Sequence, residues 1–358
     1  MTLPPSSASD SIANNGKLPA DITVADCLRL GTKELLSLHA TSIPAARNTL
    51  GADESKDAMD VCRLEAEVLL SFVLNKDHSW LYAWPEQTVT TVDAAHYRQM
   101  LSERCSGKPV AYLTGWQEFW SMNFKVSPDV LIPRPDTELL VEISFDYLSQ
   151  LQQFAGNATE NNTSSRPNAP ARILELGTGS GAIAIALASE RCDAEITATD
   201  ISSQALQIAR NNAQRLLNES ACRITFLQSD WFQKLALANS ETSDTRNDSN
   251  NCYQLIVSNP PYIRSDDPHL SSAVTGISFE PNSALVAQDN GLQALQTIVE
   301  GAWPFMAEGA LLALEHGHDQ AEAVRQLMQH AGYLSIESRQ DLAGVERVTL
   351  GHRPGIKL

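Results

Sequence analysis

The sequence predicts an α/β fold: a mostly parallel, doubly wound sheet of seven strands, preceded by a small helical domain and a β-hairpin linker. From residue 171 onward, apolar segments of strand length alternate with segments of helix length, as a parallel sheet with crossover helices requires. A glycine-rich loop at 177–181 separates the first of these strands from the first helix. Strand signals are sparse before Trp116, and 358 residues are enough for two domains.

The N-terminal part divides into an extension and a helical domain. Residues 1–20 are rich in Ser, Pro, Ala and Asn, so we expect a disordered extension there. Residues 21–115 are predicted to form the helical domain, in which we expect the protein substrate to dock. Helical patterns occur at 24–38, 64–73 and 92–105. In the second of these, apolar residues at spacings of three and four predict one buried face; they are Leu64, Val68, Leu69, Phe72 and Val73.

Residues 116–135 are predicted to form a β-hairpin that links the two domains. Aromatic and β-branched residues are concentrated there, and Pro128-Asp129 is typical of a turn; they are Trp116, Phe119, Trp120, Phe124 and Val126. We interpret this aromatic cluster as core or domain interface in preference to a binding platform.

The catalytic domain is expected at 136–358. Its strands are predicted at 171–176, 194–199, 222–228, 253–258, 309–315, 333–338 and 346–351. Its helices are predicted near 139–148, 181–190, 203–217, 291–306 and 318–331. The last two strands are close in sequence, which indicates that the final one is antiparallel. Low-complexity segments at 152–170 and 238–251 are interpreted as surface insertions.

Composition and charge narrow the class of protein. A hydrophobic content of 43% and a charged content of 19% are ordinary for a globular protein. The formal net charge of −17 argues against a partner held mainly through phosphates, so we expect no direct nucleic-acid partner. No apolar run approaches membrane-spanning length, and no signal pattern opens the chain. The six scattered cysteines indicate buried free thiols in a reducing compartment. We therefore expect a soluble, cytoplasmic protein, and a monomer.

The glycine loop is the first functional signal. Gly177, Gly179 and Gly181 allow a tight strand-to-helix turn and a close approach of backbone N–H groups to a nucleotide-like ligand. Asp200 ends the next apolar segment, where an acid can accept both hydroxyls of a ribose. The same pattern also satisfies the dinucleotide-binding fingerprint, and Asp200 alone would be explained as a turn residue at a strand end.

The second signal distinguishes these alternatives. Asn259-Pro260-Pro261-Tyr262 closes the apolar strand at 253–258 and lies at the carboxyl edge of the sheet, where open α/β sheets bind ligands. An Asn side chain and a proline-fixed carbonyl followed by an aromatic ring can grip a planar –NH2 group and leave its nitrogen free to attack. Alone, the tetrapeptide could be a simple turn. A nicotinamide enzyme has no evident use for it, whereas an amino-methyltransferase does.

Two further segments need an explanation. The simplest explanation of the segment 131–138 is helix initiation, with Asp136 or Thr137 as the cap, but capping alone does not explain Arg134 between two prolines. We expect Arg134, Glu138 and Glu280 to shape the pocket. Glu315-His316-Gly317-His318 offers metal-ligand types, but no further group has ligand spacing, so we predict no metal.

With these motifs in place, the chain resembles the PrmC/HemK enzymes, which methylate the side-chain amide nitrogen of a glutamine in peptide chain release factors. The resemblance runs from about residue 60 to the C-terminus. It rests on the segments 107–115, 131–138, 175–181, 229–232, 259–262, 279–281 and 346–351. It implies a class I (Rossmann-like) S-adenosylmethionine-dependent methyltransferase fold. Departures are the N-terminal extension and the two insertions, which touch no motif.

The resemblance also implies residue roles. Gly177, Thr178, Gly179, Ser180 and Gly181 would lie along S-adenosylmethionine. Asp200 would hold its ribose, and Trp231, with Asp230 beside it, would pack near its adenine. Asn259 and the Pro260 carbonyl would accept the two amide hydrogens of the substrate, with Pro261 and Tyr262 completing the substrate site.

Three alternatives remain open from the sequence. An adenine-N6 DNA or RNA methyltransferase would use the same Asn259–Tyr262 chemistry on a flipped base, but it would need a basic recognition domain that residues 1–130 do not offer. A non-catalytic cofactor-binding protein is disfavoured because every motif residue is present, and a nicotinamide dehydrogenase is more distant still.

Overall fold

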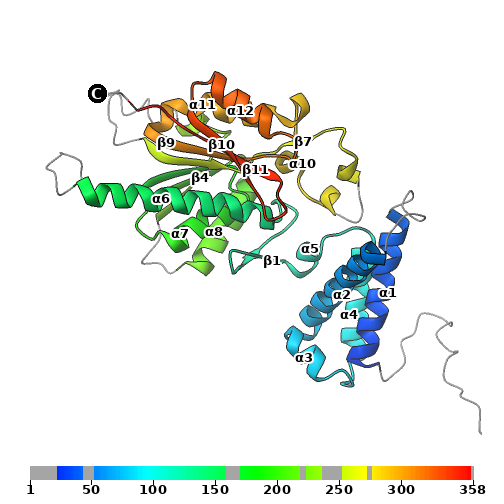
Figure 1. The fold of residues 1–358 in the computed structure, drawn as a ribbon. Coiled ribbons are helices and arrows are strands. Elements are labelled where there is room, and N and C mark those ends of the chain that lie inside the picture. The colour runs from blue at the N-terminus through cyan, green and yellow to red at the C-terminus, as the bar shows by residue number, and fades with distance from the viewer. Residues whose placement is uncertain are drawn as a thin grey trace, which may run out of the picture. The chain divides into compact units, whose positions relative to one another are not determined.

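The computed structural model describes residues 22–42, 52–158, 170–217, 223–235, 252–271 and 276–355. The chain divides into two compact units, one of residues Met1–Thr114 with Ser272–Gly276, the other of Gly115–Ser271 with Ile277–Leu358 (Figure 1). The extension expected at 1–20 and the insertion expected at 238–251 lie outside the described residues.

The first unit is helical. Its helices are α1 (Val24–Ser42), α2 (Ala52–Leu74), α3 (His78–Ala83), α4 (Thr91–Cys105) and α5 (Val110–Thr114). Side chains begin two of them: Asp77 accepts from the backbone N–H of Trp80 at the start of α3, and Thr90 accepts from that of Asp93 at the start of α4. A common apolar core joins α1, α2 and α4.

The buried face predicted for α2 was partly wrong. Leu69 is buried, but Leu64 is 54% exposed and Phe72 is 41% exposed. The buried apolar positions of α2 are Cys62, Ala66, Leu69 and Leu70. The helix carries apolar residues on two sides, and only packing against both α1 and α4 selects the side that is buried.

The second unit is built on a seven-stranded sheet in the order β10-β11-β9-β6-β3-β4-β5. The strands are β3 (Arg172–Leu176), β4 (Glu195–Asp200), β5 (Arg223–Gln228), β6 (Tyr253–Ser258), β9 (Met306–Glu315), β10 (Leu334–Gln340) and β11 (Glu346–His352). The neighbouring strands β5, β4, β3, β6 and β9 all run parallel, whereas β11 is antiparallel to both of its neighbours, β9 and β10. This confirms the predicted α/β fold and its antiparallel final strand.

Helices cover both faces of this sheet. They are α6 (Glu138–Ala158), α7 (Ala182–Glu190), α8 (Ser203–Leu216), α11 (Gln293–Gly301) and α12 (Ala321–His330). The short helix α10 (Asn282–Leu285) instead contacts β8 (Val286–Ala287), which pairs with β7 (Ile263–Arg264). Figure 1 shows α6, α7 and α8 on one face and α11 and α12 on the other. Strand β3 is buried on both faces. Ile173 packs into the apolar core with α6 and α7, and Leu174 and Leu176 pack into the apolar core with α11 and α12.

Two predicted boundaries in this unit were wrong. Helix α6 continues to Ala158, into the segment interpreted as an insertion from residue 152. The helix predicted over 291–306 ends at Gly301, and a 3-10 turn (Trp303–Phe305) follows it. Pro304 lies in that turn; it lacks a backbone N–H and would clash with the preceding helical turn.

The predicted hairpin forms at the start of the second unit. Strands β1 (Trp116–Phe119) and β2 (Met122–Lys125) pair antiparallel around Trp120 and Ser121, which both have positive φ. Phe119 and Phe124 meet edge to face inside the core next to α6 and α7. The buried Asn212 side chain bonds the N–H and C=O of Lys125 and also the carbonyl of Ser180, so α8 links the hairpin to the glycine loop.

Cys27 and Cys62 are buried free thiols, as expected, but the free thiol of Cys192 is exposed. Cys222 lies outside the described residues. Among the helices described, none combines the length and apolar character needed to cross a membrane.

Candidate active site

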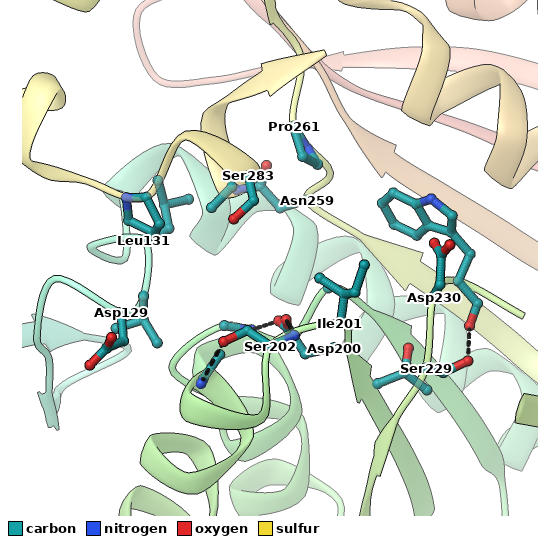
Figure 2. A pocket seen from close by; sticks show the side chains of 18 residues that line it. Asp129, Leu131, Asp200, Ile201, Ser202, Ser229, Asp230, Asn259, Pro261 and Ser283 are labelled. Carbon is teal, nitrogen blue, oxygen red and sulfur yellow. Dashed lines mark hydrogen bonds between the residues drawn. The ribbon is translucent and has the colours of Figure 1, made fainter. Parts of the chain in front are cut away.

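A cavity lies at the carboxyl ends of β3, β4, β5 and β6, inside the second unit (Figure 2). This is the edge at which an open parallel sheet binds ligands. Its sequence-predicted lining residues are Gly177, Gly179, Asp200, Asp230, Trp231, Asn259 and Pro261. Lining residues that the sequence did not single out as site residues are Asp129, Val130, Leu131, Thr199, Ile201, Ser202, Ala205, Ser229, Pro281, Ser283 and Ala284.

The glycine loop presents backbone to this cavity. Gly177 and Gly179 have φ of 72° and 55°, and a Cβ at either would meet no atom within 4 Å. Gly181 serves packing instead: a Cβ there would lie 3.0 Å from Ile185 Cδ1 and 3.1 Å from Ala209 Cβ. Thr178, Ser180 and Gly181 are not among the lining residues.

The buried acid Glu175 holds the glycine loop in place through hydrogen bonds. Glu175, near the end of β3, is 1% exposed; its Oε2 accepts from the Thr178 hydroxyl at 2.6 Å and from the Ala184 N–H at 3.2 Å. Burial raises the pKa of this carboxyl to about 8, against the lowering effect of those two donors. The sequence analysis missed this role, although an acid inside an apolar strand two residues before a glycine loop was a usable signal.

Asp200 ends β4 and faces the cavity (Figure 2). Its Oδ2 accepts from the Gly179 N–H at 2.8 Å and its Oδ1 from the Ser202 N–H at 2.9 Å. Burial raises the pKa of this carboxyl, and the backbone donors oppose that shift. Because each carboxylate oxygen can accept more than one hydrogen bond, the carboxylate can still bind hydroxyl groups of a ligand.

The segment after β5 forms another wall. The Ser229 hydroxyl donates to the Trp231 carbonyl and accepts from the Lys234 N–H. These bonds hold Trp231 at a positive φ of 45°. The Trp231 ring lines the cavity and also packs against the apolar layer that contains α11 and α12. The exposed Asp230 lies beside it at the cavity edge.

The segment 259–262 follows β6. Asn259 lines the cavity, and its Nδ2 donates to the Thr137 hydroxyl at 3.1 Å, which leaves its carbonyl oxygen available to a ligand. Pro260 is buried, and Pro261 reaches the cavity. Tyr262 does not line the cavity; its hydroxyl donates to Glu315 Oε1 at 3.3 Å, and its carbonyl accepts from Gln320.

The segment 131–138 meets this site from the other side. Glu280, whose side chain is fully buried, accepts from the Ile132 N–H at 3.0 Å and pairs with Arg134, so it joins the loop at Leu131 to the segment at Pro281. Burial raises the pKa of Glu280, and Arg134 opposes that shift. Glu138 lies elsewhere: its carboxylate accepts from the Trp120 N–H at the hairpin turn.

Simple capping does not describe the start of α6. A 3-10 turn (Pro135–Thr137) runs into the helix, and no side-chain hydrogen bond caps the start of that turn. Asp136 pairs with Arg347 at 3.4 Å, while Thr137 is turned toward Asn259. Tertiary partners therefore replace the local capping bond.

His316, from the suspected metal cluster, is buried. Its Nε2 hydrogen-bonds with the Thr349 hydroxyl at 2.8 Å, and its Nδ1 with the Gly317 carbonyl at 2.9 Å. Across the described part of the chain, no group of three or more His, Cys, Asp or Glu is placed to hold a metal ion.

Comparison with known proteins agrees with this arrangement. Residues 50–115 match a family profile described as the PrmC N-terminal domain, and residues 167–338 match one described as a methyltransferase domain. A release factor glutamine methyltransferase of Vibrio cholerae is 40% identical over 87% of this chain and 97% of its own. Those of Escherichia coli and Aliivibrio fischeri are 42% and 38% identical, over 81% and 82% of this chain and 91% and 92% of their own. The chain therefore belongs to the release factor glutamine methyltransferase family.

Proposed function

We propose that this enzyme transfers a methyl group from S-adenosylmethionine to the side-chain amide nitrogen of the glutamine in the Gly-Gly-Gln motif of peptide chain release factors. The observation that carries the proposal is Asn259, whose amide N–H is bound to Thr137 while its carbonyl oxygen is left for a ligand at the cavity. The names of relatives about 40% identical to this chain support the same substrate.

The residues around the cavity fit S-adenosylmethionine. Gly177 and Gly179 offer open backbone, which lets a ligand approach closely, and the Asp200 carboxylate is suited to the two hydroxyls of a ribose. The Trp231 ring provides an apolar wall for an adenine, with Asp230 at the edge. When bound, the cofactor supplies a methyl group on a positively charged sulfur.

The residues after β6 would activate and orient the substrate. An amide nitrogen is a poor nucleophile because its lone pair is delocalised into the carbonyl group. Asn259 Oδ1 and the Pro260 carbonyl would accept its two hydrogens, which returns electron density to nitrogen and aims it at the methyl group. Fixed polar groups and positioning supply the large terms in such a transfer. The proton would leave afterwards to solvent.

The helical unit would dock the protein substrate. Its helix α2 carries exposed apolar side chains at Val61, Leu64 and Phe72, a surface suited to a protein partner. Because the proposed substrate is a release factor, we propose that the enzyme acts in the cytoplasm and that its methylated product takes part in translation termination. We also propose that the enzyme acts as a monomer, which light scattering on the purified protein would check.

The test is transfer of labelled methyl from S-adenosylmethionine to a purified release factor. A Gln→Ala variant in its Gly-Gly-Gln loop and an adenine-rich DNA serve as controls. We expect label on the unmodified factor alone. Label on the DNA alone would mean that residues 259–262 serve adenine, and would overturn the proposal.

A further inference from the structure

We propose that Glu315 is a positioning residue for methyl transfer: through Thr137, it determines which edge of the Asn259 amide faces the substrate. This inference rests on the proposed function, because it concerns the residue that would bind the substrate amide. Glu315 ends β9, and neither the cavity lining nor the proposed chemistry assigns it a role.

Tyr262 and Thr137 contact the Glu315 carboxylate, and Thr137 connects it to Asn259. Tyr262 donates to its Oε1 at 3.3 Å. Thr137 interacts with the same carboxyl and lowers its pKa. Thr137 in turn accepts from Asn259 Nδ2 at 3.1 Å. The contact between Thr137 and Glu315 falls short of full hydrogen-bond geometry, and Oε2 of Glu315 has no hydrogen-bond partner.

The direction of these bonds follows from the donors available. An ionised carboxylate can only accept, so Thr137 must give it the single hydrogen of its hydroxyl. The Thr137 oxygen is then left as an acceptor, and only the NH2 edge of Asn259 can satisfy it. The carbonyl edge of Asn259 is thereby turned away from Thr137 and kept for the substrate amide. Without the carboxylate, Thr137 could donate to the Asn259 oxygen, and the amide could reverse.

The burial of Glu315 argues against a role in stability alone. The residue is 1% exposed, and Thr137 is 4% exposed. A buried carboxylate with an unpartnered oxygen is destabilising compared with an apolar side chain of similar size. Such groups gather where a function requires them, and this one lies directly behind the Asn259–Tyr262 segment.

Protonation of Glu315 should have the same effect as its removal. Burial raises the pKa of Glu315 to about 7. The groups that face it are Thr137, Tyr262, Asp136 and Arg347, and Arg347 is itself paired with Asp136 and Asp341. Below that pKa the carboxyl can donate to the Thr137 oxygen, which frees the Thr137 hydrogen for the carbonyl edge of Asn259. The transfer rate should therefore fall as pH falls through about 7.

The experiment compares Glu315→Gln and Thr137→Val with the wild type in single-turnover methyl transfer between pH 6 and pH 8.5. We expect each variant to be about 10- to 100-fold slower at pH 8, with near-normal cofactor affinity. We also expect the decline in rate at low pH to be absent from Glu315→Gln. The double variant should be no slower than the slower single variant, because the two residues act through one chain of bonds. Thr137→Ser should recover the rate that is lost in Thr137→Val. Ser144→Ala is the matched control, because it removes a buried hydroxyl from α6 that bonds only within its own helix.

A second measurement needs no release factor. The side-chain NH2 signals of 15N-labelled Asn259, assigned by their loss in Asn259→Asp, should titrate with a midpoint near pH 7 in the wild type and stay constant in Glu315→Gln. Titration without methyl transfer would support the Glu315 inference and count against the proposed substrate. Signals insensitive to pH, or wild-type rates in both Glu315→Gln and Thr137→Val, would overturn the inference.

Discussion

At the scale of single residues, Asn259 is the side chain whose loss should separate chemistry from binding. It reaches the cavity from the end of β6, and its carbonyl oxygen is free of the Thr137 contact. We expect Asn259→Ala to slow single-turnover methyl transfer by about 100-fold or more, because a fixed acceptor for the developing charge is lost. Cofactor affinity, measured by calorimetry, should change little. A variant that transfers methyl at the wild-type rate would remove Asn259 from the mechanism.

Sequence reasoning identified residues whose role is local and missed those whose role depends on distant partners. The glycines, Asp200 and Asn259 stand at strand ends in recognisable spacings, so the sequence was sufficient to propose them. Thr137 and Glu315 act through hydrogen bonds to residues that are far away in the chain. Thr137 and Asn259 are 122 residues apart in the chain, and no local pattern reports such a pair.

At the scale of elements, the glycine loop offers a matched pair of substitutions. Both Gly179→Ala and Gly181→Ala strain a backbone of positive φ, by about 1–2 kcal/mol. Only at Gly181 does the added Cβ meet α8, at Ala209, so this variant should lose more stability in thermal unfolding. Gly179→Ala points into open space at the cavity and should lose more cofactor affinity. The reverse order would show that the loop is not the cofactor-binding element.

Helix α2 permits a test of substrate docking. Leu64→Glu and Phe72→Glu change exposed side chains and should raise the KM for the release factor, with kcat and cofactor affinity unchanged, if α2 docks the substrate. Leu69→Ala is the contrasting variant. Leu69 is fully buried, so this change should cost about 2–5 kcal/mol of stability. Unchanged KM values in both surface variants would place docking elsewhere.

Helix boundaries show where local patterns were sufficient. α7 and α8 begin within a residue of their predicted positions, because Gly181 and the capping hydroxyl of Ser202 mark their starts. The buried face of α2 was mispredicted because tertiary packing, not a local pattern, decided it.

At the scale of the whole molecule, buried acids couple stability to pH. The folded-state pKa of Glu175 is raised from 4.5 to about 8, so between those values the unfolded chain has released a proton that the folded protein retains. Stability should therefore fall as pH rises from about 5 to about 8. Glu175→Gln should show a shallower fall in the thermal unfolding of the second unit, with part of the slope remaining from Glu315. An equal slope in both proteins would contradict the raised pKa.

Sequence patterns were sufficient to predict the alternation of strands and helices, the sheet with its antiparallel final strand, the glycine loop and the family. Each of these depends on periodicity or on short motifs whose physical requirements are local. Tertiary structure alone decided which face of α2 is buried, that Glu280 joins the segments at Leu131 and Pro281, and that Thr137 lies between Asn259 and Glu315. The Glu280 and Thr137 bonds bring together residues more than 100 positions apart. Burial also raises the pKa values of Glu280 and Glu315, which composition does not reveal.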